Sequence, residues 1–155
     1  MTIEMRPIGK VQNEFTSAVP DGWESALHRI LVDPCWAPAL KGLEGFSHIY
    51  VVFWLHGIAG DIAQHVHPEN RQDLPAVGLF ATRTPRRPNP IGLQVVELIS
   101  RRRNVLTVRG LDALNGSPVI DLKPYLPRGD SIADARTPDW IQQLWAGPEG
   151  PPPAD

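Results

Sequence analysis

Short apolar runs, separated by Gly, Pro and Asn, alternate with polar segments along the chain. The runs are rich in β-branched and aromatic residues, and no long stretch repeats its apolar residues with the helical period of about 3.6 residues. The longest run, residues 49–55, is continuous and of strand length, so we expect a central strand buried on both faces. The pattern predicts a mainly β domain with few short helices.

A second pair of strands is expected in the C-terminal half. Residues 105–110 and 118–122 are separated by a connection that contains Asn115-Gly116, a dipeptide that adopts positive φ readily. We therefore expect these two strands to form a hairpin-like pair. Residues 26–32 fit either a strand or a short helix. The remaining strand candidates are residues 8–12, 77–80 and 91–99.

One helix signal lies near the C-terminus. Pro138 fits the first helical position and Thr137 fits the N-cap before it. The predicted helix runs to residue 145 and needs a surface against which its apolar side can pack. That side is one stripe formed by Trp140, Ile141, Leu144 and Trp145.

The composition is that of one globular domain: 155 residues, of which 42% are hydrophobic and 21% charged. A formal net charge of −2 gives no general attraction to nucleic acid, so contact with RNA would depend on local basic patches. The single cysteine, Cys35, excludes an internal disulfide and a cysteine-rich zinc site. No leader pattern and no apolar run of bilayer length is visible, so we expect a cytoplasmic protein without a membrane partner.

The loop of residues 80–92, Phe-Ala-Thr-Arg-Thr-Pro-Arg-Arg-Pro-Asn-Pro-Ile-Gly, holds three arginines and three prolines. Each proline fixes its own φ and restricts the residue before it, so the loop is stiff and cationic. Composition alone would also fit a proline-rich segment that docks onto an aromatic groove. We favour a pre-formed binding loop, because strand candidates flank it on both sides.

A second polar cluster follows at residues 111–125, and no G-x-G-x-x-G or Walker loop accompanies it. In an extended segment Asp121, Lys123 and Tyr125 project from the same face. From spacing alone, this is either a solvated strand face or the polar part of a site.

These segments together resemble the TrmO family, also called YaeB-like or TsaA-like. The similarity covers roughly residues 3–130, in order and at compatible spacing. It implies a small single-domain β-barrel (residues 1–136) that is not a Rossmann fold. The residue pattern beyond it predicts the short helix (137–146) and, from its Pro- and Gly-rich composition, a flexible tail (147–155). The segments that carry the resemblance are Gly-Leu-Glu-Gly-Phe-Ser-His (42–48), Phe-Ala-Thr-Arg (80–83), Arg-Pro-Asn-Pro-Ile-Gly (87–92), Leu-Asp (111–112) and Asn-Gly-Ser-Pro-Val-Ile-Asp-Leu-Lys-Pro-Tyr (115–125).

The resemblance also implies a function: a homodimeric enzyme that uses S-adenosyl-L-methionine to methylate N6 of threonylcarbamoyl-adenosine at position 37 of tRNA. An arginine fork such as that of Arg83 suits the donor's carboxylate, and Asp112 suits its ribose hydroxyls. Without the resemblance, both residues would be read as ordinary surface charges. The cofactor-binding set that it implies is His56, Gly57, Arg83, Leu93, Arg109, Gly110, Leu111 and Asp112.

Methyl transfer to a nitrogen is an in-line displacement, so the protein mainly aligns the reactants and excludes water. The lone pair of the acceptor nitrogen is delocalised and its proton must leave, which calls for a general base. Asp121 is the first candidate and Tyr125 the second. Lys123 would lower the pKa of the phenol or contact substrate anions.

Residues 61–71 carry further polar side chains. His56, Asp61, His65 and His67 are candidate zinc ligands, but methyl transfer needs no metal and we expect none. We expect His65, His67, Asn70 and Arg71 to belong to the acceptor pocket or to a phosphate-contacting rim. The predicted substrate-binding set is His65, His67, Asn70, Arg87 and Asn89, with Arg71 beside them.

The chain departs from the family pattern in two places. Val-Pro-Asp-Gly-Trp-Glu (19–24) stands where longer members carry a Pro-Arg-Gln-Pro-Gly-like motif, so Asp21 and Trp23 are the candidates to replace its cofactor contacts. The chain also stops before the C-terminal domain of longer members. A small-molecule N-methyltransferase and a non-catalytic S-adenosyl-L-methionine-binding module therefore remain as alternatives.

Overall fold

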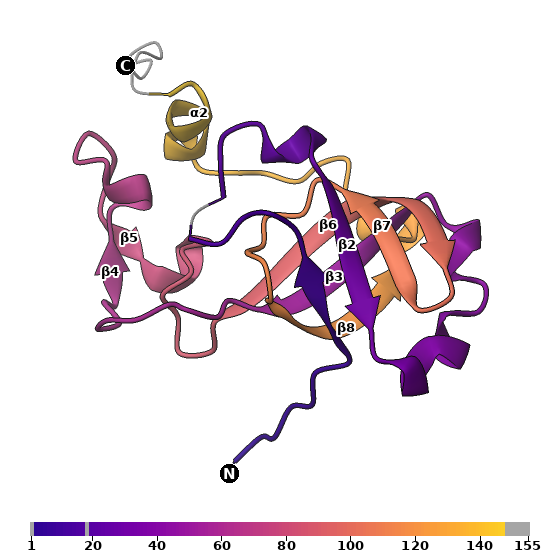
Figure 1. Cartoon of the computed structure of the whole chain (residues 1–155). Coiled ribbons are helices and arrows are strands. Elements are labelled where there is room, and N and C mark those ends of the chain that lie inside the picture. Colours follow the sequence, from indigo (N-terminus) through magenta and orange to yellow (C-terminus); the bar gives the residue numbers. More distant parts are fainter. Residues whose placement is uncertain (1, 18, 148–155) are drawn as a thin grey trace.

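The short apolar runs form strands because alternate side chains can be buried on one side of a sheet. In the computed structural model, which describes residues 2–17 and 19–147, six strands close into an antiparallel barrel (Figure 1). Their order around the barrel is β1-β2-β7-β6-β3-β8. The expected small, mainly β barrel is thereby confirmed. Its strands are β1 (Gly9–Gln12), β2 (Leu27–Val32), β3 (His48–Trp54), β6 (Ile91–Arg102), β7 (Val105–Arg109) and β8 (Pro118–Pro124).

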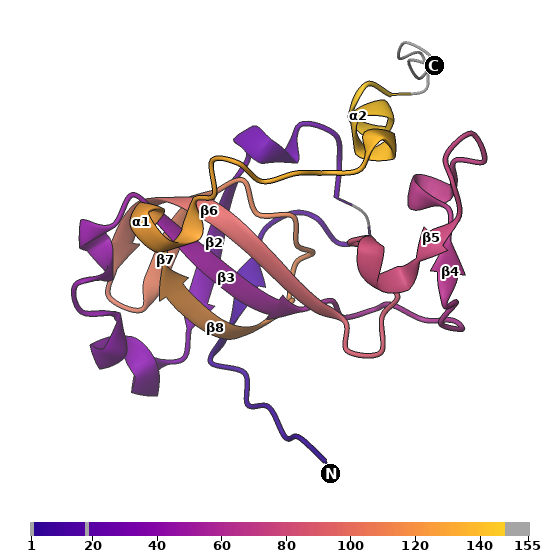
Figure 2. The same ribbon diagram turned by 180° about the vertical axis from the view of Figure 1, so that it is seen from behind.

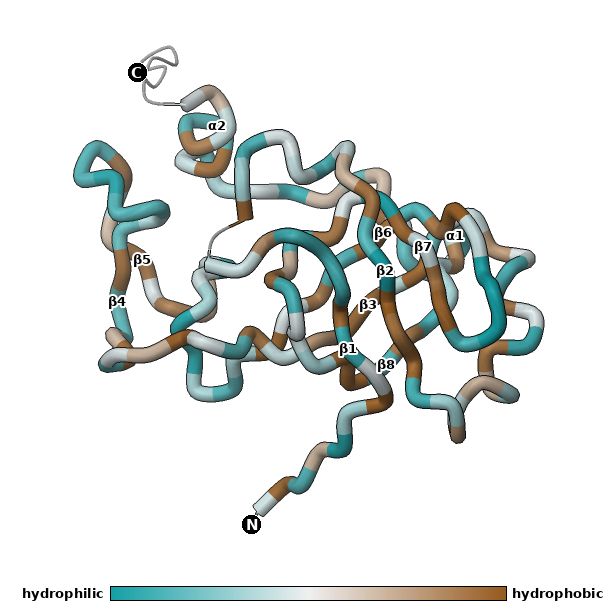
Figure 3. Tube along the Cα trace, viewed as in Figure 1, coloured by the Kyte–Doolittle hydropathy of each residue, from teal (hydrophilic) through white to brown (hydrophobic). Residues whose placement is uncertain are grey.

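The hydrophobic core fills the inside of the barrel, and hydrophobic positions concentrate along its strands (Figure 3). On β3, Ile49, Val51 and Phe53 are at most 3% exposed, whereas Tyr50 between them keeps part of its side chain in solvent. The prediction that residues 49–55 are buried on both faces is therefore wrong. A closed barrel has one packed interior, so outward side chains stay on the surface.

The expected pairing of the two C-terminal strands is also wrong. β7 pairs with β2 and β6, while β8 pairs with β1 and β3. Closure of the barrel determines which strands pair, and residues 110–117 cross one end of the barrel instead of forming a tight hairpin between β7 and β8. Gly116 does adopt positive φ (83°), and its N–H donates to the carbonyl of Val11 on β1.

The segment before the loop of residues 80–92, which we call the Pro-Arg loop, differs from the prediction. Residues 77–80 supply no core strand: β5 (Val77–Gly78) pairs only with β4 (His65–Val66), in a separate two-stranded sheet. A 3₁₀ turn, Leu79–Ala81, follows directly. The Pro-Arg loop is thus held by a barrel strand only on its β6 side.

Residues 26–32, for which a strand and a helix were both open, form strand β2. Helix α2 (Asp139–Trp145) occupies the predicted C-terminal helix position, with Pro138 rather than Thr137 at its N-cap. Of the predicted tail, residues 148–155 lie outside the described part of the chain. The remaining helical elements are α1 (Pro127–Asp130) and the 3₁₀ turns Trp23–Ser25, Pro34–Leu40, Leu43–Gly45 and Pro68–Asn70.

β4, the turn Pro68–Asn70, β5 and α2 gather at one end of the barrel, as opposite views agree (Figure 1 and Figure 2). We call this group of elements the side lobe. Within residues 2–17 and 19–147, no helix has the length and apolar character needed to cross a bilayer.

Candidate functional site

A cleft of about 570 Å³ opens at one end of the barrel; we call it the barrel cleft. The end of β3, the start of β6 and the connection between β7 and β8 supply most of its wall. This volume lies in the range of small-molecule sites, about 300–1,000 Å³. The lining residues are Ser17, Val19, Phe53, Leu55, His56, Ile58, Thr82, Arg83, Pro85, Arg87, Ile91, Gly92, Leu93, Gln94, Asp112, Ala113, Leu114 and Ser117.

The floor of the barrel cleft is a close contact between Phe53 and Gly92. A Cβ atom at Gly92 would lie 2.4 Å from Cζ of the Phe53 ring, which is closer than real Cβ contacts allow. Phe53 is 3% exposed, so the ring has little freedom to move away. This explains why a glycine ends the Arg-Pro-Asn-Pro-Ile-Gly segment.

His56 follows the last residues of β3 and is half-buried in the cleft wall. Its Nδ1 lies 3.0 Å from the hydroxyl oxygen of Ser117, which is 2% exposed. The chain before it is fixed by a 2.7 Å hydrogen bond from the Leu55 N–H to the carbonyl of Pro90. His56 is therefore held between the two segments that frame the cleft.

Asp112 reaches the cleft because its neighbours are anchored in the core. Leu111 is 0% exposed and Ala113 3%, so the carboxylate between them is directed outward into the cleft. Partial burial, helped by the negative charge of Glu24, raises the pKa of the Asp112 carboxyl. An uncompensated carboxylate at the wall of a cleft is a candidate ligand-binding group.

A buried polar network supports the turn that carries Asp112. The side-chain amide of Asn13 donates to the carbonyl of Ala113 (2.8 Å) and lies 3.1 Å from Nδ1 of His28. His28 is 1% exposed, and burial lowers its pKa, partly offset by the carbonyl of Trp23. A neutral imidazole can accept the amide proton, so the network fits an uncharged His28.

The Pro-Arg loop is stiffened by Arg87 as well as by its prolines. The Arg87 guanidinium donates to the carbonyls of Thr82 (2.8 Å) and Thr84 (3.3 Å) and lies 6.0 Å from the centre of the Phe80 ring. These bonds hold the segment that presents Arg83, which is exposed. Arg87 lines the barrel cleft, whereas Arg83 lines the barrel cleft and also the second cleft described next.

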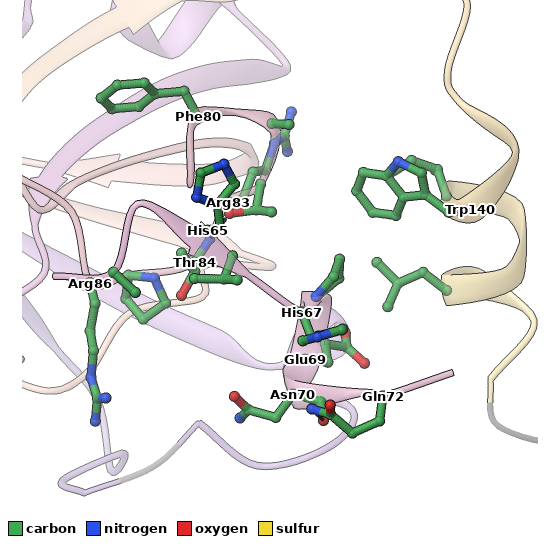
Figure 4. A pocket seen from close by; sticks show the side chains of 18 of the residues that line it. His65, His67, Glu69, Asn70, Gln72, Phe80, Arg83, Thr84, Arg86 and Trp140 are labelled. Carbon is green, nitrogen blue, oxygen red and sulfur yellow. Dashed lines mark hydrogen bonds between the residues drawn. The ribbon is translucent and has the colours of Figure 1, made fainter. Parts of the chain in front are cut away.

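A larger cleft, of about 1020 Å³, separates the β4–β5 hairpin from α2; we call it the lobe cleft (Figure 4). Thr82, Arg83 and Pro85 line both clefts, so the two adjoin along this segment. His67 and Trp140 lie on opposite walls of the lobe cleft, and His65 lies beside Arg83 (Figure 4). Its other lining residues are Asp61, Ala63, Val66, Pro68, Glu69, Asn70, Gln72, Phe80, Ala81, Thr84, Arg86, Thr137, Ile141, Leu144 and Trp145.

Backbone strain marks the floor of the lobe cleft. Glu69 and Asn70 have φ values of 50° and 59°, a left-handed conformation that is costly for two successive non-glycine residues. Strained backbone of this kind clusters at functional sites. The turn persists because the N–H of Asn70 donates to the carbonyl of His67 (3.0 Å).

Arg71 ties α2 to the hairpin. Its guanidinium pairs with Asp73 through two atoms, at 3.2 and 2.5 Å, and donates to the carbonyl of Gln143 in α2 at 3.3 Å. The Arg71 side chain is only 14% exposed. Arg71 lines neither cleft, but it lies beside the lobe cleft and joins the hairpin to α2.

The three predicted catalytic residues lie elsewhere on the barrel. Nζ of Lys123 is 2.7 Å from Oδ2 of Asp121 on the outer face of β8, and both side chains are largely exposed. Tyr125 packs against Tyr50, with ring centres 5.8 Å apart. None of the three predicted residues lines either cleft of the single chain.

The structure brings together half of the predicted cofactor set: His56, Arg83, Leu93 and Asp112 all line the barrel cleft. The other four do not line it. Gly57 and Gly110 are turn residues with φ of 77°, Leu111 belongs to the core, and Arg109 pairs with Glu97 at 2.8 Å on the outer surface.

The predicted substrate set divides between the two clefts. His65, His67 and Asn70 line the lobe cleft and Arg87 the barrel cleft. Asn89 lines neither, and its carbonyl accepts the N–H of Ile91 at 2.8 Å.

Sequence reasoning missed several lining residues of the barrel cleft. Ser17 and Val19 occupy its wall, whereas the proposed replacements Asp21 and Trp23 do not. Two other lining residues could have been recognised from the sequence: Gln94, which is polar inside an apolar strand run, and Ser117. In residues 2–17 and 19–147, no cluster of three or more His, Cys, Asp or Glu side chains is placed to hold a metal ion.

Comparison with known proteins gives consistent matches. The family model described as "tRNA-methyltransferase O N-terminal domain" matches residues 15–131. A "Probable S-adenosyl-L-methionine-binding protein" of Methanothermobacter thermautotrophicus is 43% identical over 136 residues, which cover 85% of this chain and 96% of the relative. The "tRNA (adenine(37)-N6)-methyltransferase" of Escherichia coli is 41% identical over 104 residues, covering 64% of this chain and 44% of the relative.

A solved structure, "Crystal structure of TrmO", superposes with a TM-score of 0.73 at 34% identity. The match covers 88% of this chain and 64% of the other chain. The present chain thus spans less than half of the Escherichia coli enzyme and about two thirds of the solved TrmO chain.

Proposed function

Because this chain belongs to the TrmO family, we propose that it is an S-adenosyl-L-methionine-dependent methyltransferase that acts on a nitrogen acceptor. The observation that carries the proposal is the meeting of two clefts along Thr82, Arg83 and Pro85. A methyl transferase has to hold its donor and acceptor in line, and adjoining clefts suit that requirement.

The barrel cleft fits the donor. Arg83 offers a guanidinium fork for the amino-acid carboxylate, and Asp112 offers a carboxylate for the ribose hydroxyls. Apolar walls from Phe53, Leu55 and Leu93 suit the adenine ring. When bound, S-adenosyl-L-methionine would supply an electrophilic methyl group on a sulfonium centre.

The lobe cleft fits the acceptor, for which we propose adenine 37 of tRNA, as in the name of the Escherichia coli relative. Trp140 and the 79%-exposed Phe80 offer aromatic faces for a base. Among the described residues, Arg83 and Arg86 form no ion pair, so both are available to phosphate.

A small-molecule acceptor is the second candidate. The net charge of −2 gives no long-range pull toward RNA, and Asp61 and Glu69 place carboxylates on the wall of the lobe cleft. A polynucleotide backbone would be repelled by these carboxylates, whereas a small cationic or neutral amine would not.

We also propose that the protein forms a homodimer and acts in the cytoplasm. β6 presents a row of outward apolar side chains: Ile91 (37% exposed), Leu93 (60%), Val95 (36%) and Ile99 (39%). A second copy covering this row would bury it, and Asp121, Lys123 and Tyr125 lie on the same outer face two strands away. In that arrangement the three residues would lie close to the dimer interface.

The dimer has its own test. Val95→Asp should shift the mass in solution from about twice 17.1 kDa to that of one chain, because a carboxylate would be buried in the interface. Ile132→Asp, at a 72%-exposed position off this face, is the matched control. A single-chain mass for the unaltered protein at micromolar concentration contradicts the dimer.

The catalytic proposal is tested with methyl-labelled S-adenosyl-L-methionine. One reaction contains tRNA from cells that lack the Escherichia coli relative, and a second contains a small-metabolite extract. We expect label in tRNA, lost in Asp112→Ala and kept in Asp134→Ala, which lies outside both clefts.

The other outcomes separate the alternatives. Label only in metabolites supports the small-molecule enzyme. Donor binding without transfer indicates a binding module, and no donor binding overturns the proposal altogether.

A further inference from the structure

The protonation state of one ring nitrogen in the lobe cleft can be read from its hydrogen bond. Nδ1 of His67 lies 2.8 Å from the carbonyl oxygen of Leu74. A carbonyl oxygen only accepts hydrogen bonds, so Nδ1 carries the proton. Leu74 is 2% exposed, which shields this bond from competing water.

The other ring nitrogen is therefore a lone-pair acceptor when the imidazole is neutral. Nε2 of His67 makes no hydrogen bond to any described residue and is not a buried atom lacking a partner. His67 lines the lobe cleft, where it faces Trp140 (Figure 4). The free acceptor site is thus available to a molecule in this cleft.

The backbone around His67 is rigid. The buried Pro68 follows it and keeps His67 in extended geometry, with φ of −83° and ψ of 124°. The strained pair Glu69 and Asn70 comes next, closed by the Asn70 N–H on the His67 carbonyl. The loop thus fixes both the position and the tautomer of the ring.

We propose that Nε2 of His67 takes the proton from the acceptor nitrogen during methyl transfer. This inference rests on the proposed function and goes beyond it by naming the base. The acceptor nitrogen forms a bond to the methyl carbon, the carbon–sulfur bond breaks with its electron pair going to sulfur, and the N–H proton moves to Nε2. The Leu74 carbonyl continues to accept from Nδ1–H in the resulting imidazolium.

Charged groups of both signs line the lobe cleft together with His67: the carboxylates of Asp61 and Glu69, and the guanidinium groups of Arg83 and Arg86. His65, the neighbouring histidine, is exposed and has no hydrogen bond that fixes its tautomer among the described residues. Asp121, the base expected from sequence, lines neither cleft of the single chain.

Two substitutions at His67 separate catalysis from loop structure. Asn places an amide N–H at the position of Nδ1, so His67→Asn can keep the Leu74 bond while removing Nε2. Gln places its amide at the position of Nε2 and loses the Leu74 bond. Asp134→Asn, at a position that lines neither cleft, is the control.

With tRNA as the acceptor in single-turnover assays, we expect His67→Asn to lower methyl transfer by about 10²- to 10⁴-fold, the usual worth of a general base. Its melting temperature and affinity for S-adenosyl-L-methionine should match those of the unaltered protein. Transfer by His67→Asn within about threefold of normal overturns the role. Absence of transfer to tRNA by the unaltered protein overturns tRNA as the acceptor and leaves the role of His67 to be measured with the small-metabolite extract.

A second readout does not depend on activity. Long-range ¹⁵N–¹H NMR correlations of the imidazole distinguish the two neutral tautomers. We expect His67 to carry its proton on Nδ1, as the Leu74 bond requires, whether or not the donor is present. A proton on Nε2 would remove the acceptor site and overturn the inference.

Discussion

The two clefts adjoin, yet they are built in different ways. The barrel cleft is formed by core strands, with Phe53, Ala113 and Ser117 each at most 3% exposed in its wall. The lobe cleft is formed by a pair of two-residue strands and a seven-residue helix, braced to each other by Arg71.

This contrast teaches where variation is tolerated. The barrel cleft shares its stability with the whole fold, so a change in it should affect both folding and donor binding. The side lobe contributes little to the core and can be altered to suit an acceptor. Substitutions in the two regions should therefore differ in their cost to stability.

The strongest contrast is between two leucines. Leu106 on β7 is 0% exposed, so Leu106→Ala should lower the free energy of unfolding by about 2–5 kcal/mol. Leu144 in α2 is partly exposed on the lobe cleft, and Leu144→Ala should cost about 1 kcal/mol or less. Urea unfolding measures both. Equal losses would show that the lobe belongs to the cooperative core.

Two glycines, one in the barrel cleft and one in the side lobe, allow a second comparison of stability. Gly92→Ala places a Cβ 2.4 Å from the buried Phe53 ring and should cost about 1–3 kcal/mol through overpacking. Gly78→Ala meets no atom within 4 Å and sits at a φ of −61°, so its effect should stay within about 0.5 kcal/mol. Thermal melts measure both changes in stability. A Gly92→Ala variant as stable as the unaltered protein would show that Phe53 can move away from the added Cβ atom.

The smallest effect on stability is expected at Asp112. Because the fold raises the pKa of this carboxyl, its ionised form weakens the apo fold above the unfolded pKa of about 3.9, and the penalty disappears as the pH falls to that value. Asp112→Asn should therefore stabilise the apo protein at pH 7 by about 0.5 kcal/mol or less, since solvent screens an exposed group.

The same substitution should weaken the binding of S-adenosyl-L-methionine by about tenfold, through loss of charge-assisted bonds to ribose. Asp134→Asn, outside both clefts, is the control for calorimetry and for melts from pH 4 to pH 8. Unchanged affinity would remove Asp112 from the donor site. An apo variant less stable than the unaltered protein at pH 7 would contradict the pKa direction.

Much of the fold was predictable because it depends on local pattern. The apolar runs at residues 49–55, 91–99 and 105–110 correspond to β3, β6 and β7 within a few residues. Strand pairing was not predictable in the same way. Which strands meet is decided by closure of the barrel, so the connection through Asn115-Gly116 gave a misleading hairpin signal.

The candidate site likewise has a part that was predictable from the sequence and a part that was not. Resemblance to the family gave His56, Arg83, Leu93 and Asp112, which share one cleft. The tautomer of His67 could not be predicted, because it depends on the carbonyl of Leu74, seven residues away. The strained turn at Glu69 and Asn70 lies between the two residues. Side-chain direction and long-range hydrogen bonds are properties of the folded chain only.

The central claim is that the methyl group passes from the barrel cleft to the lobe cleft beside Arg83. A crystal structure with S-adenosyl-L-methionine bound tests it most directly. We expect the donor between His56 and Asp112, with its carboxylate at Arg83 and its methyl group directed toward His67. A donor seated in the lobe cleft, or a methyl group directed toward the outer face of β8, would contradict it.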